Sequence, residues 1–255
     1  MRRDTGKLLL GFDEHGEVRD LGDVVHRRIR SDYRNAAAQL HRIYRDANLA
    51  TKGIVDTVMR EDGDLEHRKL VISYPYEWPA NMYKDAVLFH LQLFAELEKA
   101  QLTLKDALPN NILFDHTRPV FVDFLSMVPT DQLRQEGWLN ATGFADPRFA
   151  VLNRMMLPYL ILPYLFMARG SYRTARDLLS TRSCNCDGRP PLWCELIVPP
   201  LRRNPRLLAN NVKALILAAK LLPLRYLAKS KDSFDFLGTI AMLTEAVQNI
   251  AATAS

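Results

Sequence analysis

Glycine is scarce in this chain, and its distribution excludes the common glycine-rich phosphate-binding loops. Eleven of the 255 residues are glycine, and no two of them form a Gly-x-Gly arrangement. Such loops need closely spaced glycines, because backbone amides must approach the phosphates without interference from side chains. The first predicted turn offers only Gly11 and Gly16. We therefore expect no dinucleotide-binding turn, and S-adenosylmethionine is an unlikely cofactor for this chain alone.

Cysteine is also rare. The three cysteines, Cys184, Cys186 and Cys194, cannot all pair in disulfides, which favours a reduced, cytoplasmic setting. A structural zinc site needs four ligands, and no fourth ligand at a suitable spacing accompanies them. No apolar segment follows the basic residues at positions 2 and 3, so we expect no secretory signal.

Uninterrupted apolar runs of membrane-spanning length are missing as well. Residues 149–168 approach the length of a bilayer-spanning helix, but they contain Asn153 and Arg154. Pro158 and Pro163 interrupt the same run. We expect a buried, kinked pair of helices here and no membrane span.

The overall composition is that of a globular protein with a mild basic excess. Hydrophobic residues make up 48% and charged residues 25% of the chain, and the net charge is +5 with a pI near 9.1. This charge suits anionic ligands such as nucleotides. The basic residues between 202 and 231 spread over predicted helical faces with few aromatics among them, so no nucleic-acid partner is expected.

The strongest chemical signal is an Asp…Asn…Asp pattern around a predicted β-hairpin. Asp106 precedes Asn111 by five residues, and Asn111 opens an apolar strand at 112–114. A turn and a second apolar strand at 120–122 lead to Asp123. A hairpin of this kind places Asn111 and Asp123 at its open end, with Asp106 on the loop that leads into it. This layout is typical of a kinase catalytic centre.

The residue types suit the chemistry of that centre. Asp106 is the candidate catalytic residue, because a carboxylate there would accept the proton of a substrate hydroxyl. Asn111 and Asp123 are the candidate metal ligands, since magnesium prefers oxygen donors and needs few carboxylates. The alternative is that all three only brace turns through their backbone amides. Asp115 is expected to be a turn residue.

Apolar periodicity and turn residues predict an α+β fold in three parts. These are a small N-terminal β lobe (1–73), a hinge (74–80) and a large, mainly helical C-terminal lobe with the catalytic hairpin (81–255). Ser31 and Asn81 are the expected helix caps. The expected strands cover 7–12, 17–21, 24–29, 54–59 and 69–73, and the expected helices cover 32–47, 81–100, 149–168, 172–179, 205–222 and 234–252.

Several segments resemble a known bacterial family. These are Tyr74-Pro75-Tyr76-Glu77-Trp78, Lys84-Asp85-Ala86, Leu104-Lys105-Asp106-Ala107 and the run from Pro119 to Ser126. They look like nodulation-type or SAM-dependent methyltransferases, in which a kinase-like N-terminal region precedes a methyltransferase domain. Through Asp106, Asn111 and Asp123 the chain also resembles, more distantly, aminoglycoside phosphotransferase-like kinases.

The resemblance implies a protein-kinase-like fold and an ATP- and magnesium-dependent phosphotransferase that acts on a hydroxyl of a small molecule or glycan. One alternative is a non-catalytic pseudokinase-like module that works with a methyltransferase partner, and another is a methyltransferase fragment. Two departures matter. No glycine-rich phosphate clamp is visible, and Leu104-Lys105 stands where His-Arg or His-Gly would precede the aspartate. Arg28 is the candidate phosphate cation, and Tyr74 and Tyr76 are the other candidate cofactor-binding residues.

Overall fold

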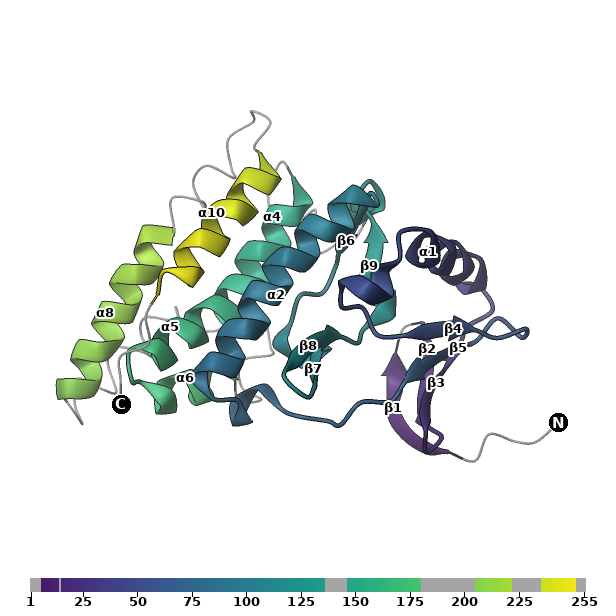
Figure 1. Cartoon of the computed structure of the whole chain (residues 1–255), viewed down its shortest axis with the longest axis horizontal. Coiled ribbons are helices and arrows are strands. Elements are labelled where there is room, and N and C mark those ends of the chain that lie inside the picture. Colours follow the sequence, from purple (N-terminus) through teal and green to yellow (C-terminus); the bar gives the residue numbers. More distant parts are fainter. Residues whose placement is uncertain (1–5, 14, 136–145, 180–204, 222–234, 251–255) are drawn as a thin grey trace.

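The computed structural model describes residues 6–13, 15–135, 146–179, 205–221 and 235–250. It has a mixed α+β architecture, with a five-stranded antiparallel sheet at one end and a group of helices at the other (Figure 1). The expected α+β class is confirmed. The cysteines and the loop around them lie outside the described residues.

The sheet has the strand order β1-β2-β3-β5-β4. Each neighbouring pair is antiparallel, and helix α1 (Arg34–Asp46) with the short 3-10 helix η1 (Leu49–Lys52) connects β3 to β4. The strands are β1 (Lys7–Asp13), β2 (Gly16–Asp20), β3 (Val24–Ile29), β4 (Thr57–Met59) and β5 (Leu65–Arg68).

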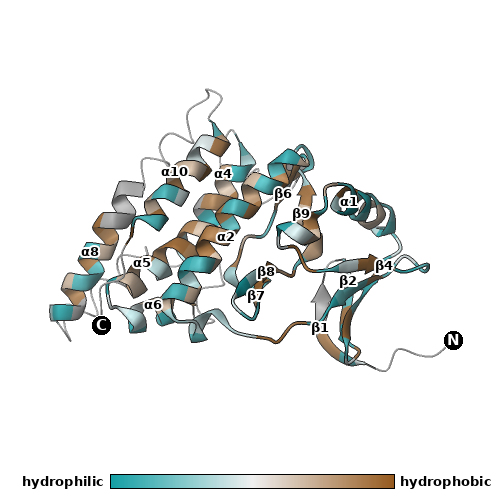
Figure 2. Cartoon of the chain, viewed as in Figure 1, coloured by the Kyte–Doolittle hydropathy of each residue, from teal (hydrophilic) through white to brown (hydrophobic). Residues whose placement is uncertain are grey.

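Helix α1 packs beside the sheet through one apolar face. Ala37, Leu40 and Tyr44 are buried on it at the spacing of three and four that places residues on one helical face. The rest of α1 is largely hydrophilic, whereas β9 (Met127–Pro129) and α5 (Leu162–Ala168) are largely hydrophobic (Figure 2). The Tyr44 hydroxyl donates to the Val55 carbonyl at 3.2 Å, which ties α1 to the start of the fourth strand.

The predicted strand at 69–73 is wrong. The fifth strand is Leu65–Arg68, and pairing with β4 begins directly after the turn at Gly63, with Met59 opposite Leu65. Residues 69–73 leave the sheet as an extended strap in which Val71 is 83% exposed. β-Branched residues favour strands only where they find a pleated, half-buried surface to pack on, and this segment has none.

The strap leads through the short 3-10 helix η2 (Pro75–Glu77) into the helical part. Helix α2 (Ala80–Lys99) lies at its centre, and α10 (Phe236–Gln248) packs against it. The other described helices are α4 (Pro147–Val151), the π-helical segment η6 (Leu152–Ile161), α5, α6 (Tyr172–Leu179) and α8 (Pro205–Leu221). Their existence agrees with the sequence, but the caps do not: the N-caps of α1 and α2 are Tyr33 and Pro79 instead of Ser31 and Asn81.

Residues 147–168 form one continuous helical run instead of the expected kinked pair. Pro158 lies inside the π-helical segment, where the hydrogen-bond spacing differs from that of an α-helix, and Pro163 lies in the first turn of α5. By length and composition this helix could cross a membrane, yet 71% of its most apolar window is buried inside the protein. The prediction that it is buried is therefore confirmed.

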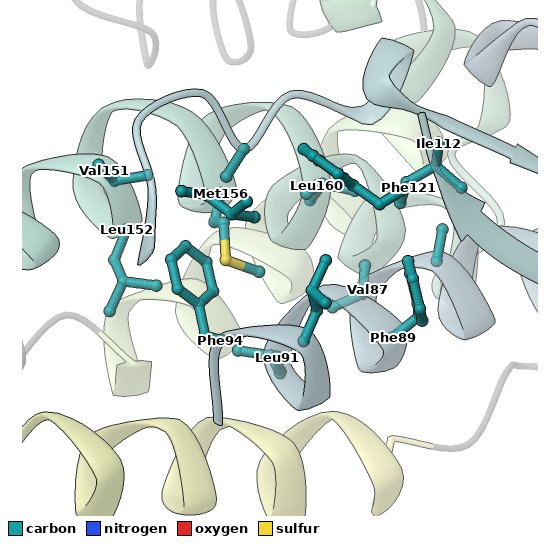
Figure 3. Close-up of a cluster of buried hydrophobic side chains, with 14 of the residues drawn as sticks. Val87, Phe89, Leu91, Phe94, Ile112, Phe121, Val151, Leu152, Met156 and Leu160 are labelled. Atoms are coloured by element: carbon teal, nitrogen blue, oxygen red, sulfur yellow. The ribbon is translucent and has the colours of Figure 1, made fainter. Parts of the chain in front are cut away.

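The core forms where this run, α2 and the hairpin meet. Figure 3 shows Phe94 and Leu91 of α2 beside Met156 and Leu152, and Val87 and Phe89 beside the hairpin. The buried Ile112 and Phe121 face each other across that hairpin, which consists of β7 (Ile112–Asp115) and β8 (Arg118–Phe121). The predicted hairpin is thereby confirmed, with strand ends within one residue or two.

Gly53 fixes the hairpin against the sheet. Its carbonyl accepts from the Phe121 amide at 2.8 Å, and the Val55 amide donates to the Phe121 carbonyl at 2.9 Å. Gly53 has a φ of 96°, and a Cβ atom there would collide with the Phe89 ring. This junction holds the open end of the hairpin under the sheet.

Candidate functional site

A cavity of about 480 Å³ lies between the sheet and the hairpin. Its walls come from β1, β2, β3 and β5, the strap after β5, the loop before β7, β7 itself and the residues that follow β8. By chemical character the lining residues fall into two groups, called here the apolar half and the polar half of the cavity. The apolar residues are Leu9, Val18, Val25, Val55, Leu70, Ile72, Leu113, Val122 and Leu125; the polar ones are His15, Asp20, Arg27, His67, Arg68, Lys69, Lys105, Asp106, Asn110, Asn111 and Asp123.

The three residues of the predicted catalytic pattern meet in this cavity. Asp106, Asn111 and Asp123 all line its polar half. The Asn111 side-chain amide donates to the Asp106 carbonyl at 3.4 Å, and the Val122 amide donates to the Asn111 carbonyl at 2.9 Å. These bonds join the loop before β7 to the residue that follows β8, so the main chain that carries the three side chains is held together.

Ser126 holds the Asp106 backbone from the other side. Its buried hydroxyl accepts from the Asp106 amide at 2.9 Å and donates to the Asp106 carbonyl at 3.0 Å. The Lys105 amide donates to the Ser126 carbonyl at 2.9 Å. The loop that carries Asp106 is thus clamped to the turn just after Asp123. Sequence reasoning did not identify Ser126, because a buried serine three residues after an aspartate carries no distinctive pattern.

The Asp106 carboxyl has a raised pKa. Burial is the main cause, the negative charge of Asp123 adds to it, and the Leu108 amide, which donates to Asp106 Oδ1 at 3.2 Å, works in the opposite direction. A raised pKa makes the Asp106 carboxylate a better proton acceptor, because a general base works best when its pKa lies close to the working pH. The same Leu108 contact is the turn-bracing bond that the alternative reading expects, so geometry alone allows both roles.

Arg27 is the charged residue of β3 that lines the cavity. It is 8% exposed, and its two terminal nitrogens each lie 3.3 Å from Asp123 Oδ1. The sequence analysis selected its neighbour Arg28, which is exposed and does not line the cavity. The alternation of side chains along β3 could have indicated Arg27. Residues i and i+2 of a strand share a face, and Val25, two residues before Arg27, also lines the cavity.

No carboxylate on α1 competes for Arg27. The helix contains one acidic residue, Asp46, at its last position. Here the recorded ion pair of Arg27 is with Asp123, one of the two candidate metal ligands.

Two further basic side chains of the cavity lining meet each other. Lys105 Nζ lies 2.7 Å from His15 Nε2, which joins the β1–β2 turn to the loop that carries Asp106. The His15 ring stacks on Tyr33 with a centroid distance of 4.0 Å. Neither residue was singled out as a ligand candidate from the sequence, because nothing in the pattern indicates that residues 90 positions apart meet.

His67 lines the deeper part of the cavity as a neutral imidazole. Burial, followed by the charge of Arg27, lowers its pKa from 6.5 to about 3. Its Nδ1 lies 2.9 Å from the Thr57 hydroxyl. An uncharged side chain that is already hydrogen-bonded within the sheet is a wall of the cavity and not a proton carrier at neutral pH.

Tyr74 and Tyr76 lie outside the cavity lining. Their rings stack on each other with centroids 5.4 Å apart, and both are about half exposed, at 49% and 46%. Nothing in the described part of the chain links them to the polar cluster. Their role as cofactor-binding residues stays a prediction.

A metal ion at this site would depend on few protein ligands. No cluster of three or more His, Cys, Asp or Glu side chains suited to a metal occurs among the described residues. Asn111 and Asp123 supply one amide and one carboxylate. Magnesium commonly binds through one or two protein oxygens with the rest supplied by water and phosphate, so this pair fits magnesium and does not fit zinc.

The chain is similar in part to a known protein. No protein-family model matches the chain. Over 99 residues the chain is 36% identical to nodulation protein NoeA of Rhizobium meliloti (strain 1021). That segment covers 38% of this chain and 18% of NoeA, so the chain corresponds to a small part of that relative's length. The resemblance to nodulation proteins is thus confirmed for a segment of the chain.

Proposed function

We propose that this chain is a kinase-like phosphotransferase that uses ATP and magnesium to phosphorylate a hydroxyl of a small molecule or glycan. The observation that carries the proposal is the convergence of Asp106, Asn111 and Asp123 on one cavity, opposite Arg27 of β3. A β3 cation, a base on the loop before a hairpin, and two oxygen ligands at the hairpin's open end are the working parts of a kinase site. The strand order and the helix between β3 and β4 are consistent with a kinase-like N-terminal lobe.

The apolar half of the cavity supports a nucleotide as the ligand. Val18 and Val25 of the sheet line the same cavity as Leu113 of β7 and Val122, which follows β8, and we expect a flat aromatic base to bind in the slot between them. The strap at residues 69–73 edges this slot, and none of the described backbone–backbone hydrogen bonds of the protein involves it. Its amides and carbonyls are therefore suited to bind the edge of a base.

The polar half supports transfer to a hydroxyl. Asp106 would orient the acceptor hydroxyl and accept its proton, and its raised pKa suits that task. Asn111 and Asp123 would hold magnesium, which when bound neutralises the phosphate charge. Because the transferred group needs little covalent help, fixed positions are the main contribution of the protein, and Ser126 supplies them for Asp106.

A second candidate function is favoured by the ion pair between Arg27 and Asp123. While they are paired, Arg27 is not available to a phosphate and Asp123 is not available to a metal ion, as expected of a non-catalytic pseudokinase-like module. The match to a segment of a nodulation protein suits such a module beside a methyltransferase, either as a partner or as part of one longer chain. Methyl transfer by this chain itself is the third possibility, and the shortage of glycine argues against it.

Ligand-induced stabilisation tests these functions. Unfolding would be followed with ATP and magnesium, with ATP alone, and with S-adenosylmethionine. A ligand at a hundred times its dissociation constant should stabilise by about 2.7 kcal/mol. Leu113→Trp fills the slot and should abolish the ATP effect, whereas Val58→Trp introduces the same side chain at a 63% exposed position of β4 and should not.

The outcomes separate the functions. Stabilisation by ATP that needs magnesium, together with transfer of labelled phosphate that Asp106→Asn abolishes, is the expected result for a phosphotransferase. Stabilisation by ATP without turnover of any kind would support the pseudokinase module. Stabilisation by S-adenosylmethionine alone would support the methyltransferase fragment, and no ATP effect in any condition would overturn the first proposal.

A further inference from the structure

The glycine at the end of the β1–β2 turn serves the pairing of two strands. Gly16 is the glycine of this turn, and a Cβ atom there would collide with the Arg28 carbonyl. Gly16 therefore allows β2 to approach β3, where it pairs with Ile29. The residue just before it, His15, lines the cavity instead. A phosphate at this end of the cavity would meet an imidazole where a kinase presents glycine amides.

His15 is held in a defined place. Its ring stacks on Tyr33, which is the N-cap of α1, and the Arg30 amide donates to the His15 carbonyl at 3.0 Å. The ring nitrogen Nε2 lies 2.7 Å from Lys105 Nζ. Lys105 is equally fixed, because its amide is bonded to the Ser126 carbonyl and its neighbour Asp106 is bonded to the Ser126 side chain. Contacts with Tyr33, Arg30 and Ser126 thus hold the two residues whose nitrogens meet.

The chemistry of this contact suits an anion. An ammonium group can only donate, so in the contact Nε2 accepts and the ring proton is on Nδ1. An oxygen of a phosphate that enters between them would accept from Lys105, and from His15 once the ring carries a proton on Nε2. Arg27 lines the same cavity from β3. Basic groups from the turn, the strand and the loop thus line the same cavity as Asp106.

We infer that His15 and Lys105 form a side-chain phosphate clamp, which binds the terminal phosphates of a nucleoside triphosphate and replaces the missing glycine-rich loop. The inference rests on the proposed function, because it needs a nucleotide in the apolar half of the cavity. It assigns recognition of the triphosphate to two side chains, whereas the slot between sheet and hairpin recognises the base. A nucleoside without phosphates gains nothing from the clamp.

Calorimetric titration of the full chain with adenosine and with ATP plus magnesium tests this division. His15→Ala and Lys105→Met should each weaken ATP binding by about tenfold or more, as expected for loss of a hydrogen bond to a charged group. Adenosine affinity should stay within about twofold in both variants, which also shows that the fold is intact. Lys52→Met is the matched control, since Lys52 is paired with Glu96 at 3.4 Å and does not line the cavity.

Three results would overturn the clamp. ATP affinity could be unchanged in both variants, it could fall as far in Lys52→Met as in Lys105→Met, or adenosine and ATP affinities could fall together. An equal fall in Lys52→Met would mean a general charge effect. A joint fall of adenosine and ATP affinities would mean a folding defect. Failure of the proposed function looks different, because neither adenosine nor ATP would then bind the wild-type chain.

Discussion

Mild acid should destabilise this protein through His90, and the variant His90→Leu should lose part of that sensitivity. His90 lies on α2 with no exposed surface, and its ring is edge-on to Phe121 at a centroid distance of 5.7 Å. Burial lowers its pKa from 6.5 to about 3, and the Ala86 carbonyl one turn earlier offsets this only in part. Neither ring nitrogen makes a hydrogen bond of ordinary geometry within the described part of the chain.

The magnitude follows from the two pKa values. Below pH 6.5 the unfolded chain takes up a proton at His90 that the folded chain does not, so stability falls as the pH decreases towards 3. At pH 5 the difference is about 1.5 pH units, and at 1.36 kcal/mol per unit the loss is about 2 kcal/mol. His67, with a pKa of about 3, adds a similar loss. The two histidines together remove about 4 kcal/mol from the wild type and about 2 kcal/mol from His90→Leu.

Urea unfolding at a series of pH values between about 7.5 and 5 measures this directly. The stability of His90→Leu relative to the wild type should rise by about 2 kcal/mol across the series, since all other titrating groups cancel in the difference. His116→Asn is the control, because the His116 side chain is 95% exposed and asparagine tolerates its positive φ of 56°. Parallel curves for His90→Leu and the wild type would refute the reasoning.

Three further predictions concern the polar half of the cavity. Arg27→Met should weaken ATP binding strongly and Arg28→Met hardly at all in calorimetry, because only the first residue lines the cavity; the reverse order would favour the sequence-based choice. Ser126→Ala should reduce the free energy of unfolding by about 1–3 kcal/mol, since two buried backbone groups of Asp106 lose their partner, and a change near zero would contradict this. Asp123→Asn should lower the pKa of Asp106, as followed by carboxyl NMR, because a neighbouring negative charge is removed; an unchanged titration would mean that burial alone sets it.

The sequence predicts the hairpin and its polar ends well because the signals there are local. Asn111, the apolar alternation and Asp123 lie within a short stretch whose pairing needs only a turn. The predicted bounds of the strand at 24–29 and of helix α6 at 172–179 are the bounds found in the structure. The strap at 69–73 was misassigned because its composition is that of a strand, while its conformation depends on where the sheet ends.

The residues that were missed are those whose role depends on distant contacts. Arg27 and Arg28 are equivalent by composition, and the choice between them requires knowing which face of β3 looks towards the hairpin. The contact between His15 and Lys105 needs the sheet and the loop to be placed together, and Gly53 provides that placement through its bonds to Phe121. A single sequence does not show which distant residues form such a junction. The lobe boundaries at 73 and 80 stay predictions.

The ion pair between Arg27 and Asp123 indicates how nucleotide and metal binding should be linked. Both groups are largely withdrawn from water, with exposed side-chain fractions of 10% and 27%, so separating them without replacement partners is costly. A phosphate alone would take Arg27 and leave Asp123 as an unpaired carboxylate near Asp106. A phosphate that arrives with magnesium supplies a partner to each, because the phosphate pairs with Arg27 and the metal ion pairs with Asp123. If the proposed function is correct, we expect ATP to bind much more tightly with magnesium than without it, since α1 offers Arg27 no alternative carboxylate.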